Sequence, residues 1–246
     1  KYKYNLQMDV LCAEYPGYGL YDSDKPSENA ILDDATLIIQ HAIQNLKYKE
    51  EDIILLGRSL GTGVAIQMAN IFTKLRGIVL ISPFLSIRDV AENMVGSVLA
   101  KVVGDIFKSK DFIQSIKTPA LFIHGALDEL IPASASKWLY DKCNAPKMLH
   151  ISPTMTHNKL NLKFDIFLPM VKFFVERLGV VELKYLYEAE VEESTSYNPN
   201  VDFNTLVDES CITEEGKEKN YEPNQARMRI ETDLLMTVDP LKTDFE

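Results

Sequence analysis

A glycine-flanked serine separates an apolar run from an amphipathic segment in this chain of 246 residues. Residues 57–61 read Gly-Arg-Ser-Leu-Gly, which is a G-x-S-x-G pattern. The run before it, residues 53–56, is wholly apolar and predicts a short buried strand. After it, residues 64–72 carry apolar side chains at the spacing of one helical face. Because the glycines let a strand and a helix approach closely, the pattern constrains the fold to a sheet with helices packed against it.

Ser59, at the tip of this turn, has two interpretations. Serine is a preferred N-cap, so its side chain could simply close the start of the helix. Alternatively, a serine on a sharp strand-to-helix turn is an exposed nucleophile, with the helix N-terminus favouring negative charge that develops beside it. The flanking strand and helix supply the context that the second interpretation requires. We therefore predict that Ser59 is a nucleophile.

Further apolar runs recur along the chain, with helical patterns between them. Each run predicts a buried strand of the same sheet. These runs are residues 9–14, 77–81, 119–123 and 147–151. Alternating apolar strands and helices predict an α/β fold with a mostly parallel sheet and helices on both faces.

Two of the predicted helices carry specific expectations. In residues 132–143, we expect Trp138 and Leu139 to face the core. Residues 160–178 read as a closing amphipathic helix rich in Phe. Pro169 lies within that helix and predicts a kink, because proline removes a backbone N–H donor.

The alternation of strands and helices is interrupted between residues 84 and 118. The apolar residues of this segment predict one or two helices with a broad apolar face. An insertion between two core strands can cover a substrate cleft as a cap or lid. An ordinary crossover helix explains the segment equally well.

A serine nucleophile needs a histidine to take its proton and a carboxylate to orient that histidine. Asp128 and His157 each follow a predicted strand, in the chain order Ser, Asp, His expected at the carboxyl edge of such a sheet. Taken singly, Asp128 is also a common type of turn residue, and His157 could be a solvent-exposed loop histidine. The agreement of residue type, order and location favours the catalytic assignment. His124 and His150 read as core or strand-end histidines.

Charge divides the chain into two parts. Residues 1–181 contain 20 Lys and Arg against 19 Asp and Glu, whereas residues 182–246 contain 6 against 17. Neither part has a basic stripe, which argues against nucleic-acid binding. We expect a core over residues 1–179 and an extended acidic tail over 180–246, with a turn or two of helix at 228–235.

Cysteine usage and hydropathy indicate a compartment. Cys12, Cys143 and Cys211 are odd in number and far apart, which favours reduced thiols over a disulfide framework or a metal site. No apolar run is long enough to span a membrane, and no signal peptide is visible. We expect a cytoplasmic protein, associated with a cytoskeleton or membrane through a partner. The sequence starts at a lysine, so we also expect residues upstream.

Four motifs together resemble the α/β-hydrolase superfamily over residues 8–178. They are EYPGYGLYDSDKPSE at 14–28, GRSLGTG at 57–63, IHGALDELIP at 123–132 and THN at 156–158. The first motif is similar to the protein-depalmitoylating branch. The resemblance implies that Ser59 is the nucleophile, Asp128 the orienting acid and His157 the base. It further implies that the Leu60 N–H is one oxyanion donor.

The sequence departs from that family in several places. The family's second oxyanion donor lies on a loop upstream of the first motif, and we expect that loop and the first strands to be absent from this chain. An exposed sheet edge would then need cover. Met155 and Thr156 stand where relatives have a glycine, and no N-terminal cysteine cluster for membrane attachment is visible.

Two functional hypotheses follow. The first is a serine hydrolase that cleaves an ester or thioester, similar to acyl-protein thioesterases, with no cofactor and no metal. The second is a hydrolase-fold protein with weak or no activity that acts as an interaction component of a larger assembly. In that case residues 180–246 would contact a protein partner and order on binding.

Overall fold

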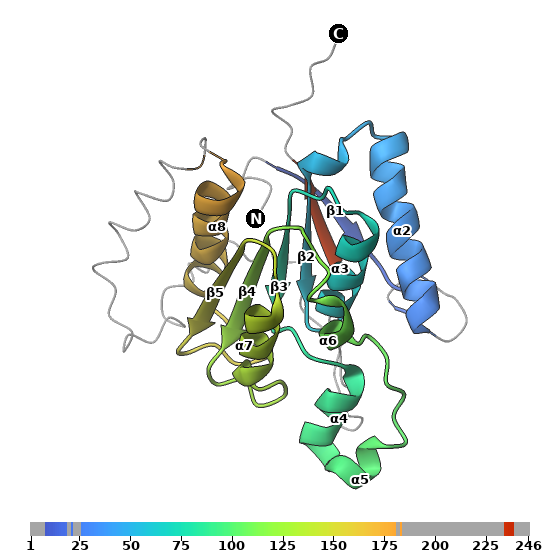
Figure 1. Cartoon of the computed structure of the whole chain (residues 1–246), viewed down its shortest axis with the longest axis vertical. Coiled ribbons are helices and arrows are strands. Elements are labelled where there is room, and N and C mark those ends of the chain that lie inside the picture. Colours follow the sequence, from blue (N-terminus) through green and yellow to red (C-terminus); the bar gives the residue numbers. More distant parts are fainter. Residues whose placement is uncertain (1–7, 19–20, 22–25, 181–182, 184–233, 239–246) are drawn as a thin grey trace, which may run out of the picture.

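The computed structural model describes residues 8–18, 21, 26–180, 183 and 234–238 (Figure 1). Within these residues the strands form a single sheet in the order β1-β6-β2-β3-β4-β5. Strands β2 to β5 are parallel, and β6 is antiparallel to both of its neighbours. The strand bounds are β1 Asp9–Ala13, β2 Ile53–Arg58, β3 Gly77–Ile81, β4 Ala120–Gly125, β5 Lys147–Ser152 and β6 Leu234–Val238. The predicted α/β fold with a mostly parallel sheet is confirmed.

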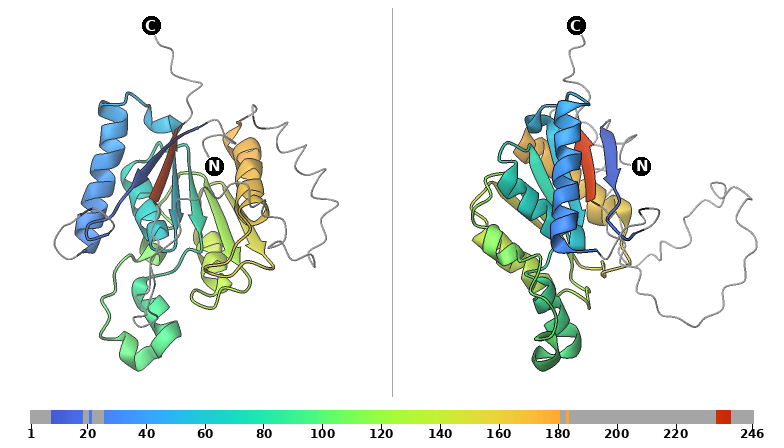
Figure 2. Two further views of the ribbon diagram at one scale, coloured as in Figure 1. Left: turned by 180° about the vertical axis from the view of Figure 1, so that it is seen from behind. Right: turned by 90° about the vertical axis from the view of Figure 1, so that its right-hand side faces the viewer.

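Helices cover both faces of the sheet, and the side chains of β2 alternate between the two core clusters that lie on these faces. Ile53 and Leu55 belong to the core cluster that packs against α2 and α3. Ile54 and Leu56 point the other way, into the cluster that packs against α8. Burial on both faces explains why the strand sequences are continuous apolar runs. The long helices are α2 Glu28–Gln44, α3 Leu60–Ile71, α7 Ala133–Lys142 and α8 Leu168–Leu178, with α2 beside α3 in Figure 2.

Two expectations about helices are corrected. Leu139 is buried, but Trp138 is 37% exposed, so the prediction that both face inward is wrong for Trp138. Successive helical residues differ by about 100° in direction, so neighbours rarely share one face. The closing helix is also not a uniform α-helix, because a π-helix, Leu162–Phe167, runs directly into α8. Pro169 lies in the first turn of α8, just after that π-helix, and the kink at Pro169 stays a prediction.

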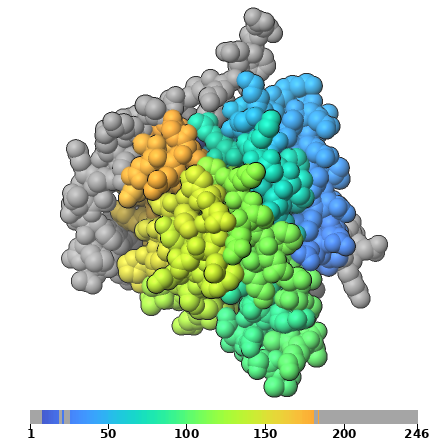
Figure 3. Space-filling model, in the orientation of Figure 1, coloured from blue at the N-terminus to red at the C-terminus, as the bar shows by residue number. Residues whose placement is uncertain are grey.

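The segment between β3 and β4 forms a projection at the end of the sheet where the parallel strands terminate (Figure 1). It contains the predicted helices, which are α4 Ile87–Val95, α5 Ser97–Ala100 and α6 Ser109–Phe112. Helices α4 and α5 stand out from the body in Figure 3, whereas α6 packs against α3. The apolar face is largely exposed rather than packed. Its exposed side chains are Met94, Val95, Val98, Leu99 and Val102. A role as a cap remains a prediction.

Of the predicted tail, the structure describes Val180, Leu183 and β6. Val180 and Leu183 are buried beside α8. Strand β6 lies between β1 and β2. The expectation of a helical turn over 228–235 is wrong at Leu234 and Leu235, which begin β6. The remainder of that expectation and the extended form of the tail lie outside the described residues.

Candidate active site

Ser59 sits on a strained turn between β2 and α3. Its φ of 50° lies in the left-handed region, which costs a non-glycine residue about 1–3 kcal/mol. A Cβ atom on Gly57 would lie 2.3 Å from the Gly61 carbonyl oxygen, so glycine is required where strand and helix meet. The Ser59 side chain makes no capping hydrogen bond to α3. The N-cap interpretation is therefore wrong, and the strained turn presents a serine hydroxyl that the helix does not use.

Leu60 is the first residue of α3. The N–H groups of the first helical turn have no carbonyl partner within their own helix. They make the start of α3 a favourable place for negative charge that develops at Ser59. The oxyanion role of the Leu60 N–H remains a prediction.

Asp128 is buried in the loop after β4. Its Oδ1 accepts hydrogen bonds from the backbone N–H groups of Leu130 (3.0 Å) and Ile131 (2.8 Å). Its Oδ2 lies 2.8 Å from His157 Nδ1. Burial alone would raise the pKa of Asp128, but hydrogen bonds from His124, His157 and the Ile131 N–H outweigh it and hold the pKa well below its ordinary value. Asp128 is thus a carboxylate at neutral pH.

The loop that carries His157 packs tightly against the loop that carries Asp128. A Cβ atom on Gly125 would lie 2.1 Å from the Met155 carbonyl oxygen. The Leu127 N–H donates to the same carbonyl at 3.1 Å. These contacts fix the two loops against each other, and the Nδ1–Oδ2 hydrogen bond follows from that fixed geometry.

His124 makes a contact that the sequence analysis did not foresee. It is fully buried, as expected of a core histidine, yet its Nε2 lies 3.4 Å from Asp128 Oδ2. The same Nε2 lies 2.8 Å from the Ile131 carbonyl oxygen, and Nδ1 lies 2.6 Å from Ser136 Oγ. The sequence signal for this contact is the position of His124 only four residues before Asp128. His150, on β5, is partly buried, and that burial lowers its pKa.

The three predicted site residues thus lie at one edge of the sheet, where β2, β4 and β5 end. Asp128 and His157 are hydrogen-bonded. Within the described residues, no hydrogen bond joins the side chains of Ser59 and His157; the connection runs from Arg58 to the His157 carbonyl oxygen, at 2.6 Å. Catalytic hydrogen bonds are often long before substrate binds. The catalytic roles of Ser59, Asp128 and His157 remain predictions.

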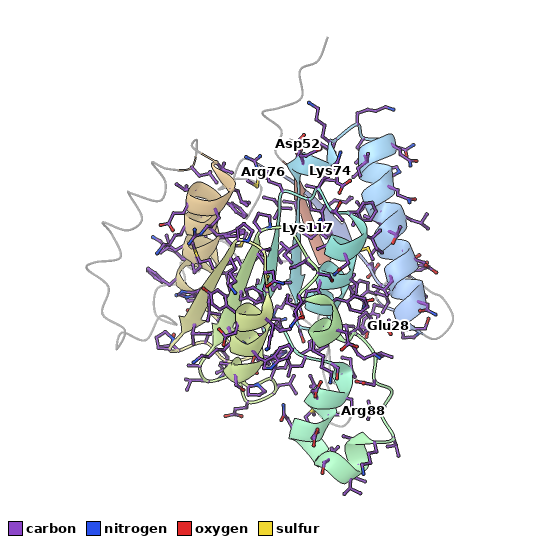
Figure 4. All side chains as sticks on the ribbon, viewed as in Figure 1. Glu28, Asp52, Lys74, Arg76, Arg88 and Lys117 are labelled. Atoms are coloured by element: carbon purple, nitrogen blue, oxygen red, sulfur yellow. The ribbon has the colours of Figure 1, made fainter. Side chains whose placement is uncertain are left out.

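The projection is anchored beside the Ser59 turn by Glu28, which is labelled with Arg88 in Figure 4. Glu28 Oε1 accepts hydrogen bonds from the Phe107 N–H (2.7 Å) and from Gln67 Nε2 (3.0 Å). Phe107 in turn packs so closely on α3 that a Cβ on Gly63 would lie 2.9 Å from its Cβ. Arg88 donates to the Val103 carbonyl within the projection. The base of the projection therefore adjoins the helix that begins at the candidate nucleophile.

A cavity of about 310 Å³ lies between α4 and α7. Its lining is mixed: Phe84, Leu85, Val90, Ile131 and Trp138 are apolar, whereas Asp89, Glu92 and Asn93 are charged or polar. This volume is at the lower end of the range for ligand pockets. Within the described residues there is no cluster of three or more metal-ligating side chains, and no helix there is both long and apolar enough to cross a bilayer.

The fold and turn define an α/β protein with a serine on a strained strand-to-helix turn at the carboxyl edge of its sheet. The profile of the family described as "Serine aminopeptidase, S33" matches residues 5–112. Protein bem46 of Schizosaccharomyces pombe is 29% identical over 177 residues, covering 70% of this chain and 59% of that protein. Alpha/beta hydrolase domain-containing protein 17C of Mus musculus is 30% identical over 138 residues, covering 56% and 42%.

Among solved structures, the Pyrococcus furiosus esterase Pf2001 superposes with a TM-score of 0.50 at 17% identity, over 71% of this chain and 68% of that one. At this identity the likeness shows the fold. The chain has the α/β-hydrolase fold, and its similarity to curated α/β-hydrolase proteins supports membership of that superfamily. It spans less than two thirds of the length of the two curated relatives named above.

Proposed function

We propose that this protein is a serine hydrolase that cleaves an ester or thioester, with Ser59 as nucleophile, His157 as base and Asp128 as the orienting acid. The observation that carries the proposal is the pairing of an uncapped serine on a strained turn with an Asp128–His157 hydrogen bond of 2.8 Å at the same sheet edge.

The chemistry follows from the hydrogen bonding of the histidine. Because the Asp128 carboxylate can only accept, His157 Nδ1 carries the proton and Nε2 is free to take one. Nε2 accepts the Ser59 hydroxyl proton as Oγ attacks the carbonyl carbon of the substrate. The C–O bond to the enzyme forms, and the carbonyl oxygen becomes an oxyanion beside the Leu60 N–H.

Collapse of this tetrahedral intermediate breaks the bond to the leaving group. The leaving alkoxide or thiolate receives the proton that His157 holds, and an acyl-enzyme remains on Ser59. A water molecule then gives a proton to Nε2 and attacks the acyl carbon. The bond to Ser59 Oγ breaks as Oγ takes back the proton from Nε2, and the carboxylic acid leaves. General base catalysis of this kind contributes about 10²- to 10⁴-fold in rate.

The substrate class rests on three observations. The apolar side chains that line part of the 310 Å³ cavity beside the Asp128 loop suit an acyl chain. The motifs of residues 14–28 resemble the protein-depalmitoylating branch of the superfamily, and the Pyrococcus furiosus relative in fold is named an esterase. Acyl-protein thioesters are therefore included in the proposed range of substrates.

A fluorophosphonate probe tests the proposal directly, since it reacts with activated serine hydroxyls. We expect the full chain to be labelled at Ser59, identified by peptide mass spectrometry. Ser59→Ala should abolish labelling, whereas Ser115→Ala, which changes an exposed serine between α6 and β4, should not alter it. A folded wild-type chain that resists the probe contradicts the proposal.

A second candidate function is an interaction component of an assembly. It is favoured by the charge of residues 182–246, with 17 acidic against 6 basic side chains. Deleting the tail is a poor test, because β6 lies within the sheet. Changing Glu188, Glu190, Glu192 and Glu193 to Gln keeps the strand. This change should weaken salt-dependent binding to a basic probe such as polylysine, and unchanged binding contradicts the candidate.

A further inference from the structure

Arg58 occupies the first variable position of the G-x-S-x-G pattern and is the last residue of β2. Its Nη2 donates a hydrogen bond of 2.6 Å to the His157 carbonyl oxygen. The same nitrogen lies 3.3 Å from Asn158 Oδ1. The residue directly before the candidate nucleophile therefore holds the backbone of the candidate base.

The other hydrogen bonds of the His157 loop do not reach the Ser59 turn. The Thr156 N–H donates to the Lys159 carbonyl, and the Lys159 N–H donates to Thr156 Oγ1, both at 2.9 Å. These bonds close a turn within the loop. Contacts of Met155 join the loop to the Asp128 side of the site. Among hydrogen bonds of the described residues, those of Arg58 are the ones that connect residues 156–159 to the strand carrying Ser59.

The environment of the guanidinium indicates that this placement is not explained by stability alone. Arg58 Nε is buried without a hydrogen-bond partner in the part of the chain that the structure describes. A buried donor without a partner costs about 1–3 kcal/mol. No ion pair of Arg58 is found among the described residues, so its charge is directed at neutral oxygens, which makes these hydrogen bonds charge-assisted.

We propose that Arg58 is a positioning residue that couples the nucleophile turn to the His157 loop and keeps the imidazole within reach of Ser59. This proposal rests on the serine-hydrolase function proposed above. Arginine suits the task because one Nη nitrogen carries two hydrogens and can serve two oxygens of the loop at once. Without this connection the loop is held from the Asp128 side only, so the imidazole loses its alignment with the serine.

The kinetic test compares Arg58→Gln and Arg58→Lys with the wild-type full chain, and uses Arg177→Gln, which changes an exposed arginine on α8, as control. A misplacement of about 1 Å costs roughly 100-fold in rate. We expect Arg58→Gln to lower kcat for a p-nitrophenyl ester, and the rate of fluorophosphonate labelling, by about 10- to 100-fold. KM should change little, because Arg58 does not contact substrate. Arg58→Lys keeps one donor and should recover part of the rate.

Hydrogen exchange of residues 153–160 supplies a readout that needs no activity. Faster exchange in Arg58→Gln, with Arg177→Gln unchanged, supports the coupling. Unchanged kcat and labelling in a folded Arg58→Gln chain overturn the proposal, as does a rate loss with unchanged loop exchange. If the wild type is not labelled, the proposed function fails, and the exchange data alone decide whether Arg58 holds the loop. If Arg58→Gln does not fold, the same comparisons are made on Arg58→Lys.

Discussion

Gly125 and Met155 are packed so closely that any side chain on Gly125 would overlap the Met155 backbone. A Cβ atom would lie 2.1 Å from the Met155 carbonyl oxygen, well inside contact distance. Gly125 ends β4 shortly before Asp128, and Met155 lies shortly before His157. This crossing of two loops sets the position of the carboxylate relative to the imidazole.

Gly125→Ala should therefore damage both stability and the site. The backbone atom it meets cannot rotate away, so the loops must separate, and overpacking of this kind costs about 1–3 kcal/mol. Urea denaturation measures the loss, and fluorophosphonate labelling should slow with it. Gly104→Ala is the matched control, because its Cβ would meet only Ile106 Cγ2, at 3.7 Å. Equal stabilities of the two variants would contradict the argument.

Asp128 should make stability depend on pH. Its pKa is lower in the folded state than the ordinary value of about 3.9, so the unfolded chain binds more protons in acid. Its contribution is complete above that ordinary value and is lost as pH falls through it toward the lowered pKa. The difference in unfolding free energy between wild type and Asp128→Asn should thus shrink below about pH 4. Glu129→Gln, at the exposed neighbour, should show no such convergence.

The Ser136 hydroxyl should stabilise the tautomer of His124 that the Ile131 carbonyl selects. The Ile131 carbonyl can only accept, so His124 Nε2 donates to it, and the Nδ1 of a neutral ring must accept from the Ser136 hydroxyl. Ser136→Ala leaves a buried acceptor without a donor, which costs about 1–3 kcal/mol. Urea denaturation should show this loss, and ¹⁵N NMR should report the Nε2–H tautomer. Ser134→Ala, on the exposed face of α7, should change neither, and an equal effect of both variants refutes the assignment.

The features that could be predicted from sequence are those with a local signal. Strands β2, β3 and β4 are buried along almost their whole length, so they are easy to recognise as largely apolar runs. Strand β5, at the edge of the sheet, is only partly buried and reads less clearly. Asp128 and His157 follow such strands, and the carboxyl ends of parallel strands meet at one edge. Their proximity at 2.8 Å follows from that topology.

The features that were missed depend on pairing between distant segments. Strand β6 is a five-residue run whose partners lie at the other end of the chain, and a run this short does not distinguish strand from helix. The Arg58–His157 hydrogen bond joins residues 99 positions apart, and no periodicity reports it. Trp138 was misplaced because its apolar character was weighed without the angle that separates it from Leu139.

Substitutions at the exposed apolar tip of the projection should show whether this segment is a lid or a crossover. Val98 is 77% exposed and Val102 is 88% exposed, so Val98→Ser and Val102→Ser should change the free energy of unfolding by no more than about 0.5 kcal/mol. A lid that folds over an acyl chain uses these side chains only when substrate is bound. The variants should then raise KM for p-nitrophenyl decanoate roughly tenfold while leaving that for the acetate ester unchanged. Leu37→Ser, at an exposed leucine of α2, is the control. If every variant keeps the wild-type KM for the decanoate ester and for the acetate ester, the segment is a crossover that takes no part in substrate binding.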